Sequence, residues 1–168
     1  MATSVTPTMP TRPASIVTKN GIELIKQFEG LCLKAYLDPI KIPTIGYGTI
    51  CYENGAKVKI GDVISQERAE ELLFHGVNQK VCSITEMIKG VPLNQNQIDS
   101  LSCFAYNVGC GALAGSTLLK KVKANRNDPT IRDEFMKWNK ARDPKTKQLV
   151  ALAGLTRRRK AEADLYFS

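Results

Sequence analysis

The sequence predicts an α+β fold in which helix predominates, within a single domain of 168 residues. Two long stretches repeat apolar residues at three- and four-residue steps, which is the period of an amphipathic helix. A stretch between them alternates apolar and polar residues among Gly, Pro and Asn-Gly turns, which predicts short strands. Hydrophobic residues make up 43% and charged residues 24%, a composition typical of globular proteins with a core.

The first 19 residues have the composition of a flexible tail. Residues 1–19 hold seven Ser or Thr, three Pro and no acidic residue. They lack the apolar core of a signal peptide, and no stretch of the chain approaches the ~18 consecutive apolar residues of a membrane span. We therefore expect no secretory signal, no stable membrane insertion, and an ordered domain over residues 20–168.

The ordered domain is predicted to start with one helix and a small sheet. Ile22, Ile25 and Phe28 recur at three-residue steps, and Gly30 stands where that helix is expected to end. The β-branched and aromatic runs that follow predict an antiparallel sheet of about three short strands. We assign residues 31–64 to this small β lobe.

The rest of the chain, residues 65–168, is predicted to form a helical lobe. Ser65 is the expected N-cap of its first helix. Asn94 and Gln97 have the spacing of a capping box for the second helix, which is expected to break at Gly109. Shorter helices are predicted at residues 117–124, 129–140 and 155–167.

Positive charge is concentrated in the second half of the sequence. The chain has 24 Lys and Arg against 16 Asp and Glu, a net charge of +8 that predicts an acidic partner. Residues 119–160 alone hold 14 basic and 4 acidic residues, with the densest run, RRRK, at 157–160. This run is compatible with a solvated helix face or with a contact for a polyanion.

Metal and cofactor chemistry is not indicated. The five cysteines form no C-x-x-C pair, and His75 is the single histidine, so the four clustered ligands of a structural zinc site are missing. The sequence therefore predicts free thiols, no metal and no cofactor.

Three side chains between residues 27 and 51 are candidates for acid–base chemistry. Glu29 ends the first predicted helix, Asp38 follows the first predicted strand, and Thr44 enters the second. A helix end that faces a sheet edge can place two carboxyls across a cleft, and glycoside hydrolysis needs one protonated and one ionised carboxyl. On spacing alone, a surface Glu29 and a turn Asp38 without a catalytic role would be the favoured interpretation.

Longer segments around these residues resemble a known family. FEG, LKAYLD and PTIGYGT, at these separations, resemble the active-site segment of phage-type lysozymes, glycoside hydrolase family 24. LNQNQIDSLSCFAYNVGCGALAGSTLLKKV resembles the central helix of that family, and GLTRRRKAEADLYFS resembles its C-terminal helix. The resemblance covers residues 20–168 and implies a lysozyme-like fold with two lobes around a cleft.

The resemblance also implies an activity. It identifies the chain as a peptidoglycan-degrading endolysin, a muramidase that hydrolyses the β-1,4 bond between N-acetylmuramic acid and N-acetylglucosamine. Glu29 would be the general acid, and Asp38 with Thr44 would hold the attacking water, giving inversion. Ile25 and Phe28 flank Glu29 and would partly desolvate it, which favours its protonated form, whereas Asp38 in a polar turn would stay charged.

Further residues are candidates for substrate binding through the same resemblance. They are Asn107, Tyr106, Ser116, Thr117, Arg157 and Arg158. Asn107 suits an N-acetyl group but also a helix end, and Ser116 or Thr117 could be a helix cap. For Tyr106, a core position is favoured over a contact with the sugar. An arginine of the C-terminal helix would pair with Glu29, and the sequence leaves Arg157 and Arg158 open.

Partners and alternatives follow from these features. We expect a monomer that acts on peptidoglycan, touches the anionic cell envelope and binds no nucleic acid. The family setting implies that it accumulates in the host cytoplasm and reaches the periplasm or wall through a holin lesion. The alternatives are a lytic transglycosylase on the same fold, against which intact Asp38 and Thr44 argue, and a basic nucleic-acid-binding module that uses residues 157–160.

Overall fold

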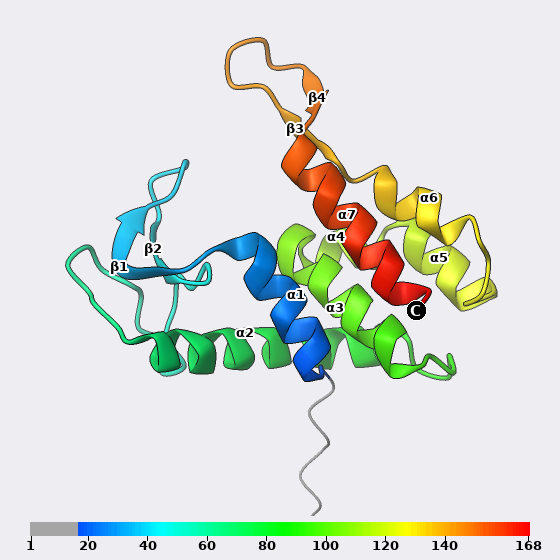
Figure 1. Cartoon of the computed structure of the whole chain (residues 1–168), viewed down its shortest axis with the longest axis horizontal. Helices are drawn as coiled ribbons and strands as arrows, with labels where there is room; N and C mark the ends of the chain where they lie inside the picture. The colour runs from blue at the N-terminus through cyan, green and yellow to red at the C-terminus, as the bar shows by residue number, and fades with distance from the viewer. Residues whose placement is uncertain (1–16) are drawn as a thin grey trace, which may run out of the picture.

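Residues 17–168 are described by a computed structural model, and they form a mostly helical body with a small β lobe on one side (Figure 1). In chain order the elements are α1 (Lys19–Glu29), β1 (Cys32–Leu37), β2 (Pro43–Gly46), α2 (Gln66–Met87), α3 (Gln95–Val108), α4 (Cys110–Ala114), α5 (Thr117–Ala124), α6 (Ile131–Met136), β3 (Lys140–Arg142), β4 (Leu149–Ala151) and α7 (Ala153–Tyr166). The predicted α+β class with predominant helix is confirmed. Of the predicted tail, residues 1–16 lie outside the described residues.

Helix α1 is fixed to the helical body at both of its ends. At its start, the backbone N–H of Thr18 donates to Asp99 Oδ1 of α3 at 3.0 Å, and Val17 is buried. Ile25, in the middle of α1, is also fully buried. The helix ends at Gly30, whose φ of +70° is open to glycine at little strain. Glu29 is therefore the last helical residue, at the junction with the β lobe.

The β lobe contains one antiparallel pair of strands rather than three strands. Strands β1 and β2 pair with Tyr36 opposite Thr44 and Leu37 opposite Pro43. The expected third strand is wrong, because residues 57–63 form only the isolated β-bridges Lys34–Val63 and Cys51–Lys57 with other segments and no continuous strand pairing. The Asp62 N–H donates to the Lys59 carbonyl at 3.1 Å, so this segment closes into a turn instead of pairing along its length.

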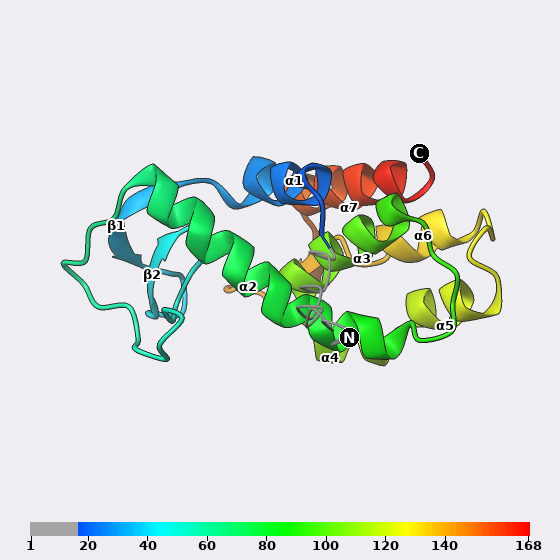
Figure 2. The same ribbon diagram turned by 90° about the horizontal axis from the view of Figure 1, so that it is seen from below.

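Helix α2, with 22 residues, runs from the β lobe into the helical body (Figure 2). The predicted N-cap is confirmed, since Ser65 Oγ accepts the Arg68 N–H at 3.1 Å. The buried side chains of α2 near its start, including Leu73, pack with α1 and Tyr47, whereas Ile84 and Ile88 near its end join the main core. One helix thus contributes to the packing of both sides of the molecule.

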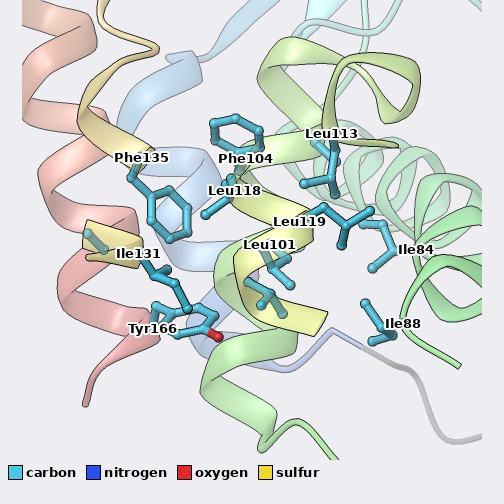
Figure 3. Packing of buried hydrophobic residues seen from close by; sticks show 13 residues of the cluster. Ile84, Ile88, Leu101, Phe104, Leu113, Leu118, Leu119, Ile131, Phe135 and Tyr166 are labelled. Atoms are coloured by element: carbon cyan, nitrogen blue, oxygen red, sulfur yellow. The ribbon is translucent and has the colours of Figure 1, made fainter. Parts of the chain in front are cut away.

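The centre of the helical body is α3, which packs against α1, α2 and α7. The predicted capping box of Asn94 and Gln97 is confirmed, and so is the break at Gly109, whose φ is +96°. Figure 3 shows the main cluster of buried side chains around Leu101 and Phe104 of α3. By contrast, the buried apolar cluster of the β lobe consists of Ala35, Ile45 and Val58.

The segment between α5 and α7 differs most from the prediction. A helix was expected over residues 129–140, but α6 begins only at Ile131, because the Asp128 carboxylate accepts the Thr130 N–H in a turn. The hairpin of β3 and β4 was missed altogether. Both strands have three residues, too few to show an alternating pattern, and the hairpin extends away from the helical body (Figure 1).

Candidate active site

Glu29 forms an ion pair that closes the junction between α1 and α7. Arg158 Nη1 lies 2.7 Å from Glu29 Oε1, although the two residues are 129 positions apart in the sequence. The Arg158 side chain is only 5% exposed and that of Glu29 is 21% exposed. Of the two arginines that the sequence left open, Arg158 is therefore the partner of Glu29, while Arg157 is exposed.

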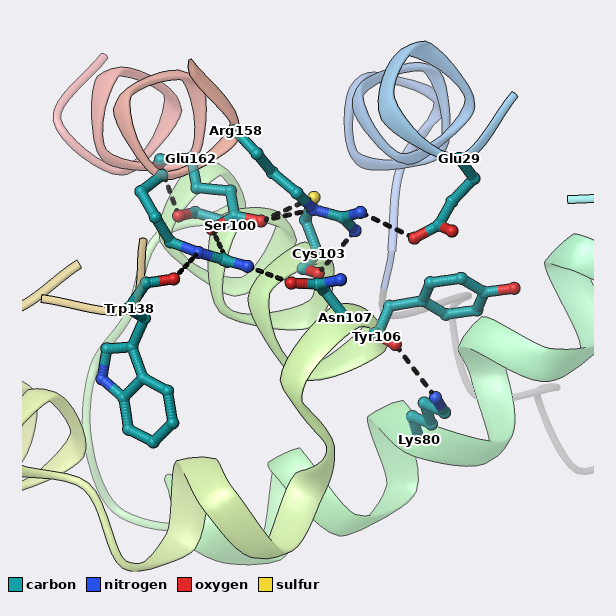
Figure 4. A network of polar contacts seen from close by, with 10 residues as sticks. Glu29, Lys80, Ser100, Cys103, Tyr106, Asn107, Trp138, Arg158 and Glu162 are labelled. Carbon is teal, nitrogen blue, oxygen red and sulfur yellow. Dashed lines mark hydrogen bonds and ion pairs between the residues drawn. The ribbon is translucent and has the colours of Figure 1, made fainter. Parts of the chain in front are cut away.

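Arg158 is itself held by a buried carboxylate (Figure 4). Its Nε donates to Glu162 Oε1 at 3.1 Å, and Arg159 Nη1 donates to Glu162 Oε2. The Cys103 thiol of α3 also points to Glu162 Oε1, at 3.4 Å. Burial raises the pKa of the Glu162 carboxyl, and the charges of Arg159 and Arg158 oppose this rise.

The second guanidinium connects this network to Asn107 at the end of α3. Arg159 Nη2 donates to the Asn107 side-chain carbonyl, and Arg159 Nε donates to the Trp138 carbonyl at 3.1 Å. Arg159 fixes the oxygen of Asn107, but the Asn107 side chain remains accessible because the residue is exposed. Two of the four residues in the RRRK run are thus buried in ion pairs, which excludes them from a surface contact with a polyanion.

Tyr106 and Lys80 form the next part of the site. The Tyr106 hydroxyl donates to the Tyr47 carbonyl at 2.9 Å, and Lys80 Nζ donates to the Tyr106 carbonyl at 3.2 Å and lies 4.6 Å from the centre of its ring. Burial lowers the pKa of Lys80. Burial and the charge of Glu29 raise the pKa of the Tyr106 phenol. Tyr106 is therefore a neutral group beside Glu29.

Two hollows meet at Glu29. One, of about 530 Å³, lies between α2 and the turn after β2, and the other, of about 600 Å³, lies between α1 and the start of α7. Glu29 and Asn107 line both, so an extended molecule that fills both hollows passes these two side chains. Gly48, with φ of +91°, forms the wall opposite Glu29, and a Cβ there would lie 3.5 Å from Glu29 Oε2.

Asp38, which follows β1, and Thr44, which lies in β2, are both hydrogen-bonded to Ile42 of the loop between the two strands. Asp38 Oδ1 accepts the backbone N–H groups of Ile40 at 2.9 Å and Ile42 at 2.8 Å. Thr44 Oγ1 donates to the Ile42 carbonyl at 3.0 Å, so both side chains are fixed to the same residue. Neither lines the two hollows.

Tyr36 links this loop electrostatically to Glu29. Burial raises the pKa of the Tyr36 phenol, and the neighbouring Cys32, Asp38 and Glu29 add to the rise. The two carboxyls predicted for catalysis therefore both act on one phenol of β1, although they come from different elements.

The predicted substrate residues Ser116 and Thr117 lie apart from both hollows. Ser116 is buried, and its hydroxyl accepts the Leu119 N–H at 3.1 Å as the N-cap of α5. Arg157, in contrast, lines the hollow beside α7. Among residues 17–168 there is no group of three or more His, Cys, Asp or Glu side chains placed to hold a metal ion.

Glu162 and Lys80 were not among the site residues predicted from the sequence. Glu162 lies four residues after Arg158 and three after Arg159, the spacing at which opposite charges meet on one helix face, so the ion pairs were detectable in principle. Lys80 carries no such signal, because its contacts are with the end of a different helix.

A helical body and a small β lobe, with a carboxylate at their junction held by a buried arginine, match the lysozyme-like class of glycoside hydrolases that the sequence resembles. Sequence comparison agrees, since the family model of phage lysozyme matches residues 26–162. The chain belongs to the phage lysozyme family. It is accordingly a lysozyme-type glycoside hydrolase of the endolysin kind, which degrades peptidoglycan, as the sequence predicted.

Individual relatives show the same similarity. The endolysin of Acyrthosiphon pisum secondary endosymbiont phage 1 is 40% identical over 152 residues, which are 90% of this chain and 98% of that protein. The endolysin structure from Escherichia coli O157:H7 phage FAHEc1 has a TM-score of 0.81 and 40% identity, covering 89% of this chain and 92% of its own. The muramidase domain of SpmX from Asticaccaulis excentricus has a TM-score of 0.80 and 31% identity, covering 90% of this chain and 97% of its own.

The length of the relatives varies. The chain spans about half of the endolysins of Bacillus phages B103 and PZA, 54% and 55% of their lengths, at 41% and 40% identity.

Proposed function

We propose that this chain is a muramidase that cleaves the β-1,4 bond between N-acetylmuramic acid and N-acetylglucosamine, with Glu29 as the general acid. The observation that carries the proposal is the place of Glu29, a partly buried carboxyl at the meeting point of two hollows, paired with Arg158. A glycan strand extends on both sides of the bond that is cut, so the acid must lie between two binding regions. The muramidase domain of SpmX, which shares the fold, supports this choice of bond.

The proposed roles of the side chains are those that the family resemblance implies. Glu29 gives its proton to the glycosidic oxygen as the bond from that oxygen to the anomeric carbon breaks. Water attacks the anomeric carbon from the opposite face, and Asp38 takes the proton of this water. Thr44 donates its own hydrogen to the Ile42 carbonyl, which leaves its oxygen free to accept a hydrogen bond from the same water. Attack from the opposite face gives inversion.

Substrate binding is assigned to the accessible residues of the two hollows. Asn107 and Tyr106 line the hollow beside α2, and Arg157 lines the hollow beside α7, where it can contact acidic groups of the substrate. Arg158 acts on Glu29 rather than on the substrate. Ser116 and Thr117 stay as weaker candidates, because Ser116 already caps α5.

Product analysis tests the reaction. Mass spectrometry of muropeptides released from purified wall should give products with a reducing N-acetylmuramic acid end. A lytic transglycosylase gives the 1,6-anhydro product instead, which is lighter by one water, and that outcome would refute hydrolysis. Release of reducing N-acetylglucosamine ends would refute the choice of bond. The nucleic-acid-binding alternative is disfavoured, since Arg158 and Arg159 of its basic run are buried.

We further propose that the enzyme is a monomer that is held near the anionic envelope by the exposed cations of its second half. No helix of residues 17–168 combines the length and the apolar character needed to cross a membrane. On the family setting, the enzyme would accumulate in the host cytoplasm and reach the wall through a holin lesion. Sedimentation of the purified chain and salt-dependent binding to whole cells test these two points.

A further inference from the structure

The buried carboxylate of Glu162 is not used by the proposed reaction, yet it lies directly behind the pair of Glu29 and Arg158. Its two oxygens accept hydrogen bonds from two guanidiniums, Oε1 from Arg158 and Oε2 from Arg159, and its side chain has no exposed surface. Moving three charged groups out of water opposes folding unless their charges and hydrogen bonds are matched closely. Such a cluster is therefore a candidate for a role in the chemistry.

Arg158 on its own would hinder a general acid. A guanidinium 2.7 Å from Glu29 favours the ionised carboxylate, whereas a general acid must carry its proton when the substrate is bound. Glu162 places a negative charge on the Nε side of the same guanidinium, opposite the Nη1 that contacts Glu29. The positive field that Arg158 exerts on Glu29 is thereby reduced.

We propose that Glu162 is a positioning residue of the active site, which holds Arg158 against Glu29 and offsets its charge so that Glu29 keeps a proton at the working pH. This inference rests on the proposed role of Glu29 as the general acid. Without the charge of Glu162, Arg158 would act on Glu29 with its full positive charge.

Other groups that face these two carboxyls come from four elements. Around Glu162 they are Arg158 and Arg159 of α7 and Cys103 of α3. Around Glu29 they are Arg158 of α7, Tyr106 of α3, Lys80 of α2 and Tyr36 of β1. The arginines and Lys80 are positive, and the phenols and the thiol are neutral at neutral pH. Among these groups, Glu162 supplies the negative charge.

The substitution Glu162→Gln tests the proposal, because it keeps the shape and removes the charge. We expect the alkaline limb of the pH–activity profile to move to lower pH by about one unit, since the uncompensated guanidiniums favour ionised Glu29. The loss of activity should therefore grow with pH. Glu134→Gln is the matched control, because Glu134 is also buried and also accepts from two cations, Lys121 and Lys137, but outside the active site.

The outcomes separate a functional from a structural role. Glu134→Gln is expected to change activity by the same factor at every pH. If Glu162→Gln also does so, Glu162 only stabilises the fold and the inference is wrong. Glu29→Gln is measured in the same assay. If that variant stays active, the proposed function has failed instead.

A measurement on the unmodified enzyme keeps the proposal testable if Glu162→Gln does not fold. Carbon-13 NMR of the glutamate carboxyls should find Glu162 ionised over the whole pH range in which the enzyme is active. A protonated Glu162 within that range would overturn the proposal, because a neutral group offsets no charge.

Discussion

The two carboxyls proposed for catalysis are held in opposite ways. Glu29 is held by side-chain charges, because Arg158 contacts it and Glu162 lies behind that arginine, all within the packed helices. Asp38 is held by main-chain N–H groups of Ile40 and Ile42 in an exposed turn. The first arrangement connects α1 with α7, whereas the second is contained in one loop.

This difference determines which changes in the protein alter the surroundings of each carboxyl. The surroundings of Glu29 change whenever a buried charge in the helical body changes, because charges interact strongly where water is excluded. The surroundings of Asp38 depend on the shape of a single turn, and water screens its charge. We therefore expect substitutions in the helical body to alter the surroundings of Glu29, and substitutions in the turn to alter those of Asp38.

The largest expected effect is the loss of the proton donor. Glu29→Gln should lower the rate of wall hydrolysis by about 10²–10⁴-fold, the usual contribution of a general acid, and should leave the fold intact. Circular dichroism checks the fold, and turbidity clearing of purified wall measures the rate. A variant that clears wall at nearly the normal rate would show that Glu29 is not the acid.

The next largest effect is expected from the removal of Arg158, the arginine that pairs with Glu29. Arg158→Ala should lower the free energy of unfolding by about 3–5 kcal/mol, because Glu162 is left as a buried charge with one partner fewer. Arg157→Ala, at the exposed neighbouring position, should change stability by no more than about 0.5 kcal/mol and act on substrate affinity instead. Urea unfolding of the two variants compares them, and equal stabilities would contradict the buried network.

Asp38→Asn should have a smaller effect than Glu29→Gln. The amide oxygen can still accept the N–H groups of Ile40 and Ile42, so the turn should keep its shape while the negative charge is lost. We expect hydrolysis to slow on the order of 10²-fold with unchanged thermal stability. A loss of stability as large as that of Arg158→Ala would mean that the turn, too, depends on charge.

Local features of the fold were predictable, and long-range ones were not. Ser65 as a cap and the pair of Asn94 and Gln97 act within four residues, so their spacing in the sequence contains the information. The choice between Arg157 and Arg158 depends on how α7 is rotated against α1, which spacing does not determine. Glu29, Asp38 and Thr44 were proposed from family-like segments, and their catalytic roles stay predictions.

The pair of Glu29 and Arg158 has a consequence for when the enzyme becomes active. Its two residues are 129 positions apart, and a ribosome adds about 5–20 residues per second, so they are made roughly 10 s apart. During that interval the nascent chain already carries Glu29, Asp38 and Thr44, but α1 has no α7 to pack against. A chain released before residue 153 should therefore contain every proposed catalytic group and still be inactive. The enzyme is then expected to become active only after α7 has been translated to its end.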